Sequence, residues 1–253
     1  AEALGSGARL LAPLRSLPLP SAMACKLTVM RDQRPTLFQH SLVMTTVAVF
    51  LALKSGLSER DCSTVAAAAL LHDLGVLHMD PAWNDPDHKV VGVGRKHLVA
   101  HPISAMLMIR DTQAYPRAAE VAVLEHHERM DGSGYLRALL GADITPMCRI
   151  LLLAEVVAAF YEKYDDMPAQ RLSLVLRLNH RKFPSALVAF ILPLLQGMKA
   201  FEYPSPLHAK QITYLLPPVK ASLLFATDTF LNQYARVAEP DDFATLQFAV
   251  AGA

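Results

Sequence analysis

The segment STVAAAALLHDLG (residues 63–75) joins a run of apolar residues to a histidine, an aspartate and a glycine. Just upstream, Ser58 and Asp61 in the sequence SERD fit the capping box that opens a helix. Gly75 is a residue type that commonly ends one. The segment therefore predicts an apolar helix that ends at Gly75 and carries a pair of polar residues at its end.

That pair, His72 and Asp73, consists of two residue types that bind metal ions. Neighbouring helical side chains point about 100° apart. Both residues can therefore hold one ion only if it lies near the helix end, or if the carboxylate reaches across to a second ion. In the alternative interpretation, Asp73 caps a turn and His72 is an ordinary core histidine.

Other segments of the chain also predict helices. Residues 36–54 are apolar with helical spacing, residues 97–110 form another candidate, and Pro116 and Pro146 suit the first turns of two more helices. Residues 83–96 are rich in Pro, Gly and Asp and predict a loop. After about residue 165 the chain still has a helical pattern, including residues 170–178, 184–196 and 222–238, and no strand is predicted.

Composition narrows the class of protein. The chain has 253 residues, 53% of them hydrophobic, and 24 Lys and Arg balance 23 Asp and Glu to a net charge of +1. No nucleic-acid polymer is therefore expected as a partner. The cysteines Cys25, Cys62 and Cys148 are odd in number and set among apolar residues, which favours free buried thiols.

No membrane span is expected either. The two longest apolar stretches, residues 186–195 and 150–161, are interrupted by a proline and a glutamate and are shorter than the roughly 18 residues that a span needs. A cytoplasmic location follows as the expectation. Residues 1–29 have no initiator Met and no clear signal-peptide pattern, and are interpreted as a linker or the start of a fragment.

Histidines gather in one part of the chain. Eight of the ten lie between residues 40 and 127, which suggests a transition metal such as Fe, Mn or Zn. In LEHHERMDGSGYL (residues 124–136), His126 and His127 would diverge by about 100° on a helix and serve two ions, one each. Alternatively, the pair frays into a surface loop. The glycine-flanked turn that follows would hold Tyr135 near the histidines, and Glu128 with Arg129 would be solvated or brace the loop.

Glu155 lies in ILLLAEVVAAF, where ten of eleven residues are apolar. A buried carboxylate needs a partner, and either a bound cation or Arg149 can supply one. His40 on an apolar helix is by itself more typical of a hydrogen-bonded core residue. His101 precedes a proline at a probable bend, and His97 lies one helical turn earlier as a neighbour. No site role is assigned to His78, His88, His180 and His208.

The order of these motifs resembles the HD-GYP family, a branch of the HD-domain metal-dependent phosphohydrolases. The motifs are His40, HDLG (72–75), HP (101–102), HHERMDGSGY (126–135) and RILLLAEV (149–156). The resemblance covers about residues 30–200, including NHRKFPSALVAFIL (179–192). It implies an all-α, HD-domain-like helical bundle over residues 30–200, with residues 201–253 as a C-terminal helical extension.

The resemblance also implies a metal site and an activity. Two divalent ions are expected, iron or manganese first, with zinc, nickel or magnesium as alternatives. The implied ligands are His40, His72, Asp73, His101, His126, His127 and Glu155, the last in place of the family's usual aspartate. Asp73 would bridge the ions and accept a proton from the attacking water, and Tyr135 would shape the mouth of the site. The implied reaction is hydrolysis of cyclic di-GMP or a related nucleotide.

Several departures from the family pattern affect phosphate handling. The sequence has Val76 for a lysine, Leu136 for the proline of GYP, Ala158 for a second aspartate, and Thr36 for a glutamate of three-metal members, while Lys163 is out of register with a phosphate-contacting residue. Two metals rather than three are therefore expected. Two other functions stay open: a non-catalytic module that binds cyclic di-GMP or a partner such as a diguanylate cyclase domain, and a hydrolase of the wider HD class acting on another nucleotide.

Overall fold

The computed structural model describes residues 7–84, 89–164, 166, 168–188, 191, 207–218, 220–221, 223–226, 228–246 and 248–251. The chain divides into two compact units, Ala1–Lys199 and Ala200–Ala253. Each unit is described by itself.

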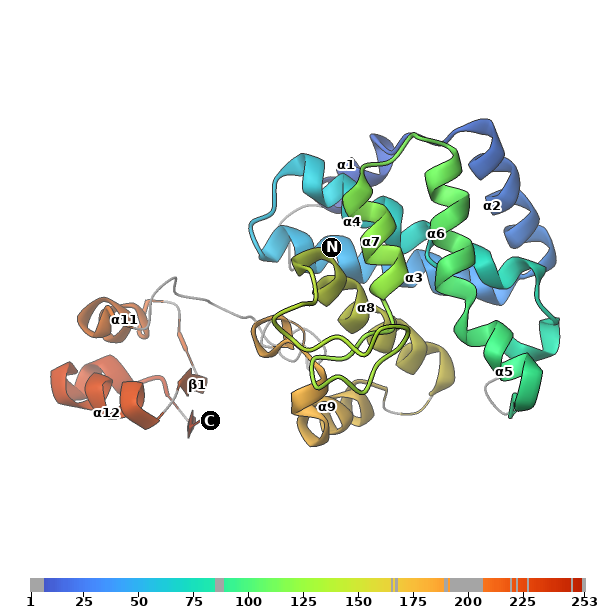
Figure 1. Ribbon diagram of the computed structural model, residues 1–253. Coiled ribbons are helices and arrows are strands. Elements are labelled where there is room, and N and C mark those ends of the chain that lie inside the picture. Colours follow the sequence, from blue (N-terminus) through green and yellow to red (C-terminus); the bar gives the residue numbers. More distant parts are fainter. Residues whose placement is uncertain are drawn as a thin grey trace. The chain divides into compact units, whose positions relative to one another are not determined.

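The first unit is helical throughout its described part (Figure 1). Its α-helices are α1 (Gly7–Arg15), α2 (Ser21–Gln33), α3 (Pro35–Lys54), α4 (Glu59–Leu71), α5 (Gly92–Val99), α6 (His101–Asp111), α7 (Arg117–Glu125), α8 (Pro146–Lys163) and α9 (Pro168–Leu178). Three short 3-10 helices are η2 (Leu74–His78), η3 (Pro81–Asn84) and η4 (His180–Lys182). The all-α fold class is thereby confirmed.

Helices α3, α4 and α8 form the centre of this unit. Helix α4 packs against α1, α3, α7 and α8, and its run of four alanines, residues 66–69, is buried. Small side chains let neighbouring helices approach closely. The capping box predicted for α4 is partly present, because the Ser58 side chain accepts a hydrogen bond from the Asp61 backbone N–H. Helices α6 and α7 lie side by side (Figure 1).

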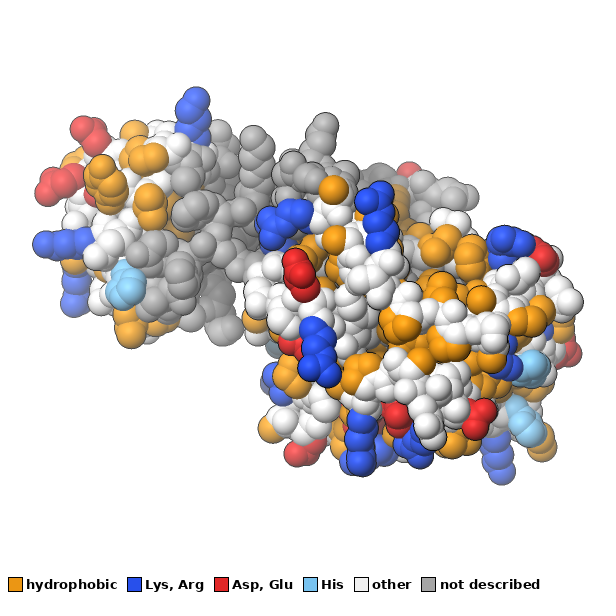
Figure 2. All heavy atoms as spheres, turned by 90° about the horizontal axis from the view of Figure 1, so that it is seen from above, with side chains coloured by type: hydrophobic (Ala, Val, Ile, Leu, Met, Phe, Trp, Pro, Cys, Tyr) orange, Lys and Arg blue, Asp and Glu red, His pale blue; other side chains and the backbone are white. Residues whose placement is uncertain are grey.

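Helix α3 is long and apolar enough to cross a membrane by length and composition, with a mean hydropathy of 1.6. Yet 56% of that stretch is buried inside the protein, and Met44, Ala48 and Leu51 have no exposed surface. These are the features of a core helix, and the part of the chain that the structure describes contains no other helix of this length and hydropathy. On the face of the first unit seen in Figure 2, Lys and Arg stand singly among acidic and apolar side chains and form no basic stripe.

The N-terminal region differs from the expected linker. The described part of residues 1–29 contains α1 and most of α2, and Leu17, Met23 and Leu27 are buried in the core of the unit. The pattern of apolar residues in this region was too irregular to reveal the helices. Cys25 is exposed, contrary to the expectation of a buried thiol, whereas Cys62 and Cys148 are free and buried as expected.

The region between α4 and α6 also differs from the sequence analysis. Helix α4 ends at Leu71, before Gly75, and a 3-10 helix follows it. The predicted loop over residues 83–96 contains η3 and the start of α5 at Gly92. The predicted helix over residues 97–110 is two helices, because the chain breaks at Ala100 and restarts with Pro102 in the first turn of α6. A proline cannot continue the hydrogen bonding of the preceding helix.

The second unit contains two strands that the sequence analysis did not predict. It comprises α11 (Ala209–Leu215), β1 (Leu223–Ala226), α12 (Asp228–Val237), η5 (Pro240–Phe243) and β2 (Phe248–Ala251), and β1 pairs with β2 in parallel. The helix predicted over residues 222–238 therefore begins only at Asp228. A four-residue apolar run is compatible with either a strand or a helix, and only the distant partner strand decides. Ala209, Ile212 and Tyr234 form a small core.

Gly75 allows the turn after α4 to approach the start of α6. A Cβ atom at this position would lie 2.2 Å from the His101 carbonyl oxygen and 3.1 Å from the Ala105 backbone nitrogen. Both neighbours are backbone atoms, which cannot move aside as the end of a flexible side chain can. The absence of a side chain at Gly75 therefore holds Asp73 beside His101.

We expect Gly75→Ala to lower the free energy of unfolding by about 1–3 kcal/mol, the usual cost of overpacking a tight contact. Chemical denaturation with circular dichroism would measure the loss. Gly141→Ala is the matched control, because the nearest atom there is the terminal methyl carbon of Met130, at 2.9 Å, on a flexible side chain. Equal stability of the two variants would contradict the close-approach argument.

Candidate metal centre

The structure brings all seven predicted ligands together. Their donor atoms form two groups, one of His40, His72 and Asp73 and the other of His101, His126 and His127, each with its ligand atoms within 4.8 Å of one another. Glu155 joins the first group, with its Oε2 2.9 Å from His40 Nε2. Asp73 links the two groups, with Oδ1 3.1 Å from His101 Nε2 and Oδ2 3.3 Å from His72 Nε2. This arrangement has the ligand types that bind divalent metal ions, with Asp73 between the two groups.

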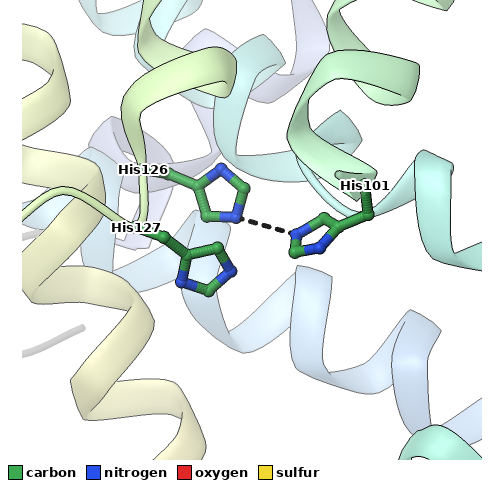
Figure 3. Close-up of side chains that lie close together, drawn as sticks. All are labelled: His101, His126 and His127. Carbon is green, nitrogen blue, oxygen red and sulfur yellow. Dashed lines mark hydrogen bonds between the residues drawn. The ribbon is translucent and has the colours of Figure 1, made fainter. Parts of the chain in front are cut away.

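The three histidines of the second group point toward one another (Figure 3). His101 is the first residue of α6, and His126 and His127 follow the last residue of α7. The rings of His126 and His127 lie 4.0 Å apart between centroids and fall in the same group, closer together than the expected divergence of about 100° suggests. His126 is fully buried, which contradicts the alternative of a frayed surface pair.

Three of the histidines share one hydrogen-bonding pattern. The Nδ1 atoms of His72, His101 and His126 each lie 2.6–2.7 Å from the backbone carbonyl oxygen three residues earlier. A carbonyl oxygen can only accept, so each Nδ1 carries the proton and donates it. Once a ring is neutral, its Nε2 atom presents a lone pair to the centre, as a metal-binding imidazole does.

These lone pairs face other acceptors. His101 Nε2 lies 3.3 Å from His126 Nε2, the contact dashed in Figure 3. His72 Nε2 is buried without a hydrogen-bond partner, although carboxylate oxygens of Asp73 and Glu155 lie 3.3 Å and 3.4 Å away. Buried acceptors that face one another repel unless a positive charge lies between them. The residues therefore fit divalent cations that take nitrogen and oxygen ligands.

The electrostatics of the two groups differ. Burial opposes protonation of His40, but Glu155 and Glu162 outweigh it and raise the His40 pKa to about 11. The same balance, dominated by Asp73, raises the pKa of His72 to about 9. In the second group, burial lowers the pKa of His127 to about 3 and that of His126 well below its usual value. In the metal-free protein, protons thus occupy His40 and His72 and leave His126 and His127 neutral.

The pKa values of the two carboxylates are lowered, although burial alone would raise them. Burial would raise the pKa of Asp73 and Glu155, but the neighbouring histidines outweigh it and hold both values well below the usual range. Arg149 is not the partner of Glu155, because its guanidinium donates to the backbone carbonyls of Ile144 and Gly141. His97 is exposed and belongs to neither group.

Glu162 belongs to the centre and was missed by the sequence analysis. Its Oε2 lies 3.0 Å from His40 Nδ1, on the side of the ring opposite Glu155. A carboxylate that accepts from the non-ligating nitrogen fixes the orientation of a metal-binding histidine. The signal was available, because Glu162 follows Glu155 by seven residues, which is two helical turns and therefore the same face of α8.

Glu128 holds the turn that carries Tyr135. This fully buried carboxylate accepts hydrogen bonds from the backbone N–H groups of Arg137, at 2.7 Å, and Leu139, at 2.9 Å. A Cβ at Gly134 would lie 2.4 Å from Glu128 Cα, so the turn packs directly on that backbone. Glu128 thus braces the loop, and Tyr135 stacks on His127 with 4.7 Å between ring centroids.

A cavity of about 280 Å³ opens onto the centre. Its walls include His40, Asp73, His127, Tyr135 and Glu155. Among the described residues that line it, none is a lysine or an arginine, and Val76 takes the position where the resemblance would place a lysine. The cavity therefore offers acids and imidazoles to a ligand, and no cationic side chain of its own.

Comparison with known proteins identifies the family. The sequence matches the HD domain family over residues 24–177. The chain belongs to this family. Within it, the chain is similar to cyclic dinucleotide phosphodiesterases and to an HDG"Y"P protein of known structure. Membership implies a divalent metal centre, in agreement with the His and Asp groups.

Two relatives illustrate the similarity. The chain is 28% identical over 160 residues to 3'3'-cGAMP-specific phosphodiesterase 3 of Vibrio cholerae, covering 61% of this chain and 33% of the relative. It is 32% identical over 117 residues to the cyclic di-GMP phosphodiesterase response regulator RpfG of Xanthomonas campestris, covering 46% and 31%. The chain thus spans about a third of the length of these relatives.

Solved structures support the fold. Bd1817, an HDG"Y"P protein from Bdellovibrio bacteriovorus, is 21% identical with a TM-score of 0.54, covering 62% of this chain and 52% of that one. The HD domain of the L. monocytogenes phosphodiesterase PgpH, in complex with cyclic-di-AMP, is 14% identical with a TM-score of 0.51, covering 68% and 94%. At these identities the likeness concerns the fold alone.

We expect Glu162→Ala to weaken divalent metal binding by about 10–100-fold, because His40 loses the acceptor that orients its ring. Titration with Mn(II), followed by calorimetry, would measure the affinity. Glu162→Gln keeps an acceptor for Nδ1–H and should lose less. Lys163→Ala, at the adjacent exposed position on α8, is the control. Equal affinities of the alanine variant and wild type would contradict the role of Glu162.

Metal binding should also release protons. The His40 pKa of about 11 and the His72 pKa of about 9 mean that both rings are protonated at pH 7 in the metal-free protein. A cation must displace these protons, so its affinity should fall as the pH falls and should level off above the higher pKa. Calorimetry in two buffers of different ionisation enthalpy would count the protons. A binding enthalpy that is independent of the buffer would contradict the prediction.

Proposed function

We propose that this chain is a metal-dependent phosphodiesterase that hydrolyses a cyclic dinucleotide, cyclic di-GMP, through a two-metal site. The observation that carries the proposal is the pair of ligand groups joined by Asp73. The names of the relatives, which are cyclic di-GMP and cGAMP phosphodiesterases, support the substrate class. Iron or manganese is the expected metal, and the cytoplasm the expected location.

Each residue of the centre has a role in this proposal. Two divalent cations would supply Lewis-acid activation of a water molecule and neutralise charge on the phosphate oxygens. Asp73 lies between the groups and is positioned to accept the proton of the attacking water. Tyr135, stacked on His127 in the cavity wall, would position the substrate at the mouth of the site. The buried histidines hold the geometry through their backbone hydrogen bonds.

A second candidate function has its own support. The cavity beside the centre has no lysine or arginine among its described lining residues, so stabilisation of the phosphate depends on the metals alone. A protein with this cavity could bind cyclic di-GMP, or a signalling partner such as a diguanylate cyclase domain, without efficient turnover. Metal content and turnover, measured on the same sample, separate the two functions.

The test uses protein purified without oxygen and supplied with Fe(II) or Mn(II). We expect two metal ions per chain and conversion of cyclic di-GMP to a linear dinucleotide or GMP, followed by chromatography. Two bound metals without turnover on cyclic di-GMP would favour the binding module instead. Turnover of another nucleotide alone would favour the wider HD class of hydrolases.

Substitution of Asp73 should separate metal binding from the catalytic step. We expect Asp73→Asn to lower kcat by about two to four orders of magnitude, because a proton acceptor that also bridges the centre is lost. His127→Ala should reduce metal content while the circular dichroism spectrum stays unchanged. His97→Ala, an exposed imidazole outside both groups, is the control. Full activity of Asp73→Asn with metal bound would contradict the role of Asp73 as the proton acceptor.

A further inference from the structure

A second cavity adjoins the metal centre. It has a volume of about 480 Å³, and its walls include Trp83, Lys89, Arg95 and Leu98. Trp83 and Leu98 also line the cavity over the centre, so the two cavities share a wall. Together they provide the space typical of a small-molecule site. A ligand larger than one phosphodiester can therefore extend from the first cavity into the second.

The two cavities have opposite charge. The cavity over the centre is lined by Asp73, Glu155 and Glu162, whereas the lining of the second contains Lys89 and Arg95 and, among the residues that the structure describes, no acidic residue. Both cations come from the segment between η3 and α6, which is distant in sequence from the positions where the resemblance would place phosphate-binding cations. The second cavity thus supplies positive charge that the first lacks.

Trp83 is held in place as a flat wall between the cavities. A Cβ at Gly94, on α5, would lie 3.0 Å and 3.4 Å from two indole carbons, so the indole packs directly on the helix backbone. The side chain is only partly buried. An indole fixed on one side and accessible on another is a suitable stacking platform for a nucleobase.

Arg95 is also close to the catalytic side of the site. Burial and the charges of Asp73 and Glu155 raise the pKa of the Tyr135 phenol, and the positive charge of Arg95 acts against this shift. The guanidinium is therefore near enough to Tyr135 for an electrostatic effect. Arg95 lines the second cavity, which shares Trp83 and Leu98 with the cavity over the centre, so a ligand that occupies both cavities can contact it.

We propose that the second cavity binds the half of a cyclic dinucleotide that is not cleaved, with a base stacked on Trp83 and its phosphate paired with Arg95 and Lys89. This inference rests on the proposed function, since it assumes a substrate with two phosphates and two bases. Trp83, Arg95 and Lys89 would distinguish such a substrate from a simple phosphodiester. Arg95 can bind the phosphate through two parallel hydrogen bonds, and Lys89 as a point charge.

The experiment compares two substrates on the metal-loaded chain. Cyclic di-GMP fills both cavities, whereas bis(p-nitrophenyl) phosphate has one phosphate and no nucleobase and tests the centre alone. We expect Arg95→Ala and Trp83→Leu each to raise KM for cyclic di-GMP by about tenfold or more. Both changes should affect hydrolysis of bis(p-nitrophenyl) phosphate far less than hydrolysis of cyclic di-GMP, because this small substrate does not reach the second cavity. Trp83→Phe should restore most of the affinity, and Lys96→Ala, an exposed cation on α5 outside both cavities, is the control.

Fluorescence gives a second measurement that does not need turnover. Trp83 is the single tryptophan of the chain, so cyclic di-GMP stacked on it should quench the intrinsic emission, and Arg95→Ala should shift that titration to higher concentration. If both variants hydrolyse cyclic di-GMP as fast as the wild type and with an unchanged KM, the second-cavity proposal is overturned and the proposed function still stands. Quenching without hydrolysis of either substrate would support the second cavity and refute the phosphodiesterase. Neither quenching nor turnover would overturn both.

Discussion

Buried imidazole nitrogens that face carboxylate oxygens and one another are the constraint on which this protein depends. His72 Nε2 has no hydrogen-bond partner, and His101 Nε2 and His126 Nε2 meet at 3.3 Å. An apolar core alone would not retain such an arrangement, because desolvated acceptors destabilise it. The surrounding helices tolerate it because α3, α4 and α8 bury an extensive apolar core around it, and a cation turns the repulsion into attraction. Fold and metal binding are thus coupled.

The ends of helices orient the imidazole rings of the centre. The last turn of an α-helix leaves its carbonyl groups without intrahelical partners. His72 and His126 each follow the last residue of a helix, and His101 follows α5 by two residues; each donates Nδ1–H to a carbonyl of that last turn. One hydrogen bond therefore caps the helix, fixes the tautomer and turns Nε2 inward. This explains why three of the ligands lie where helices stop.

The sequence revealed which residues belong to the centre but not how they meet. The order of His40, HDLG, HP, HH and Glu155 was sufficient to predict the residues that converge, because residue type and burial limit their chemistry. Helical spacing did not predict that His126 and His127 fall in one group, because their grouping depends on His101 from another helix. Glu162 was overlooked although it shares a face with Glu155. The strands of the second unit depend on pairing between segments that are over twenty residues apart, which local patterns do not encode.

Charge determines how a cavity lined by acids can accept an anion. Asp73, Glu155 and Glu162 line the cavity over the centre, and its described walls include no lysine or arginine. Without cations this cavity repels phosphate. Two divalent cations would outweigh three carboxylates and leave about one net positive charge, because the histidines that bind them are neutral. Metal loading then reverses the sign of the cavity and becomes a precondition for anion binding. The cations of Arg95 and Lys89 lie in the adjoining cavity, where they attract a phosphate without competing with the metals for the same ligands.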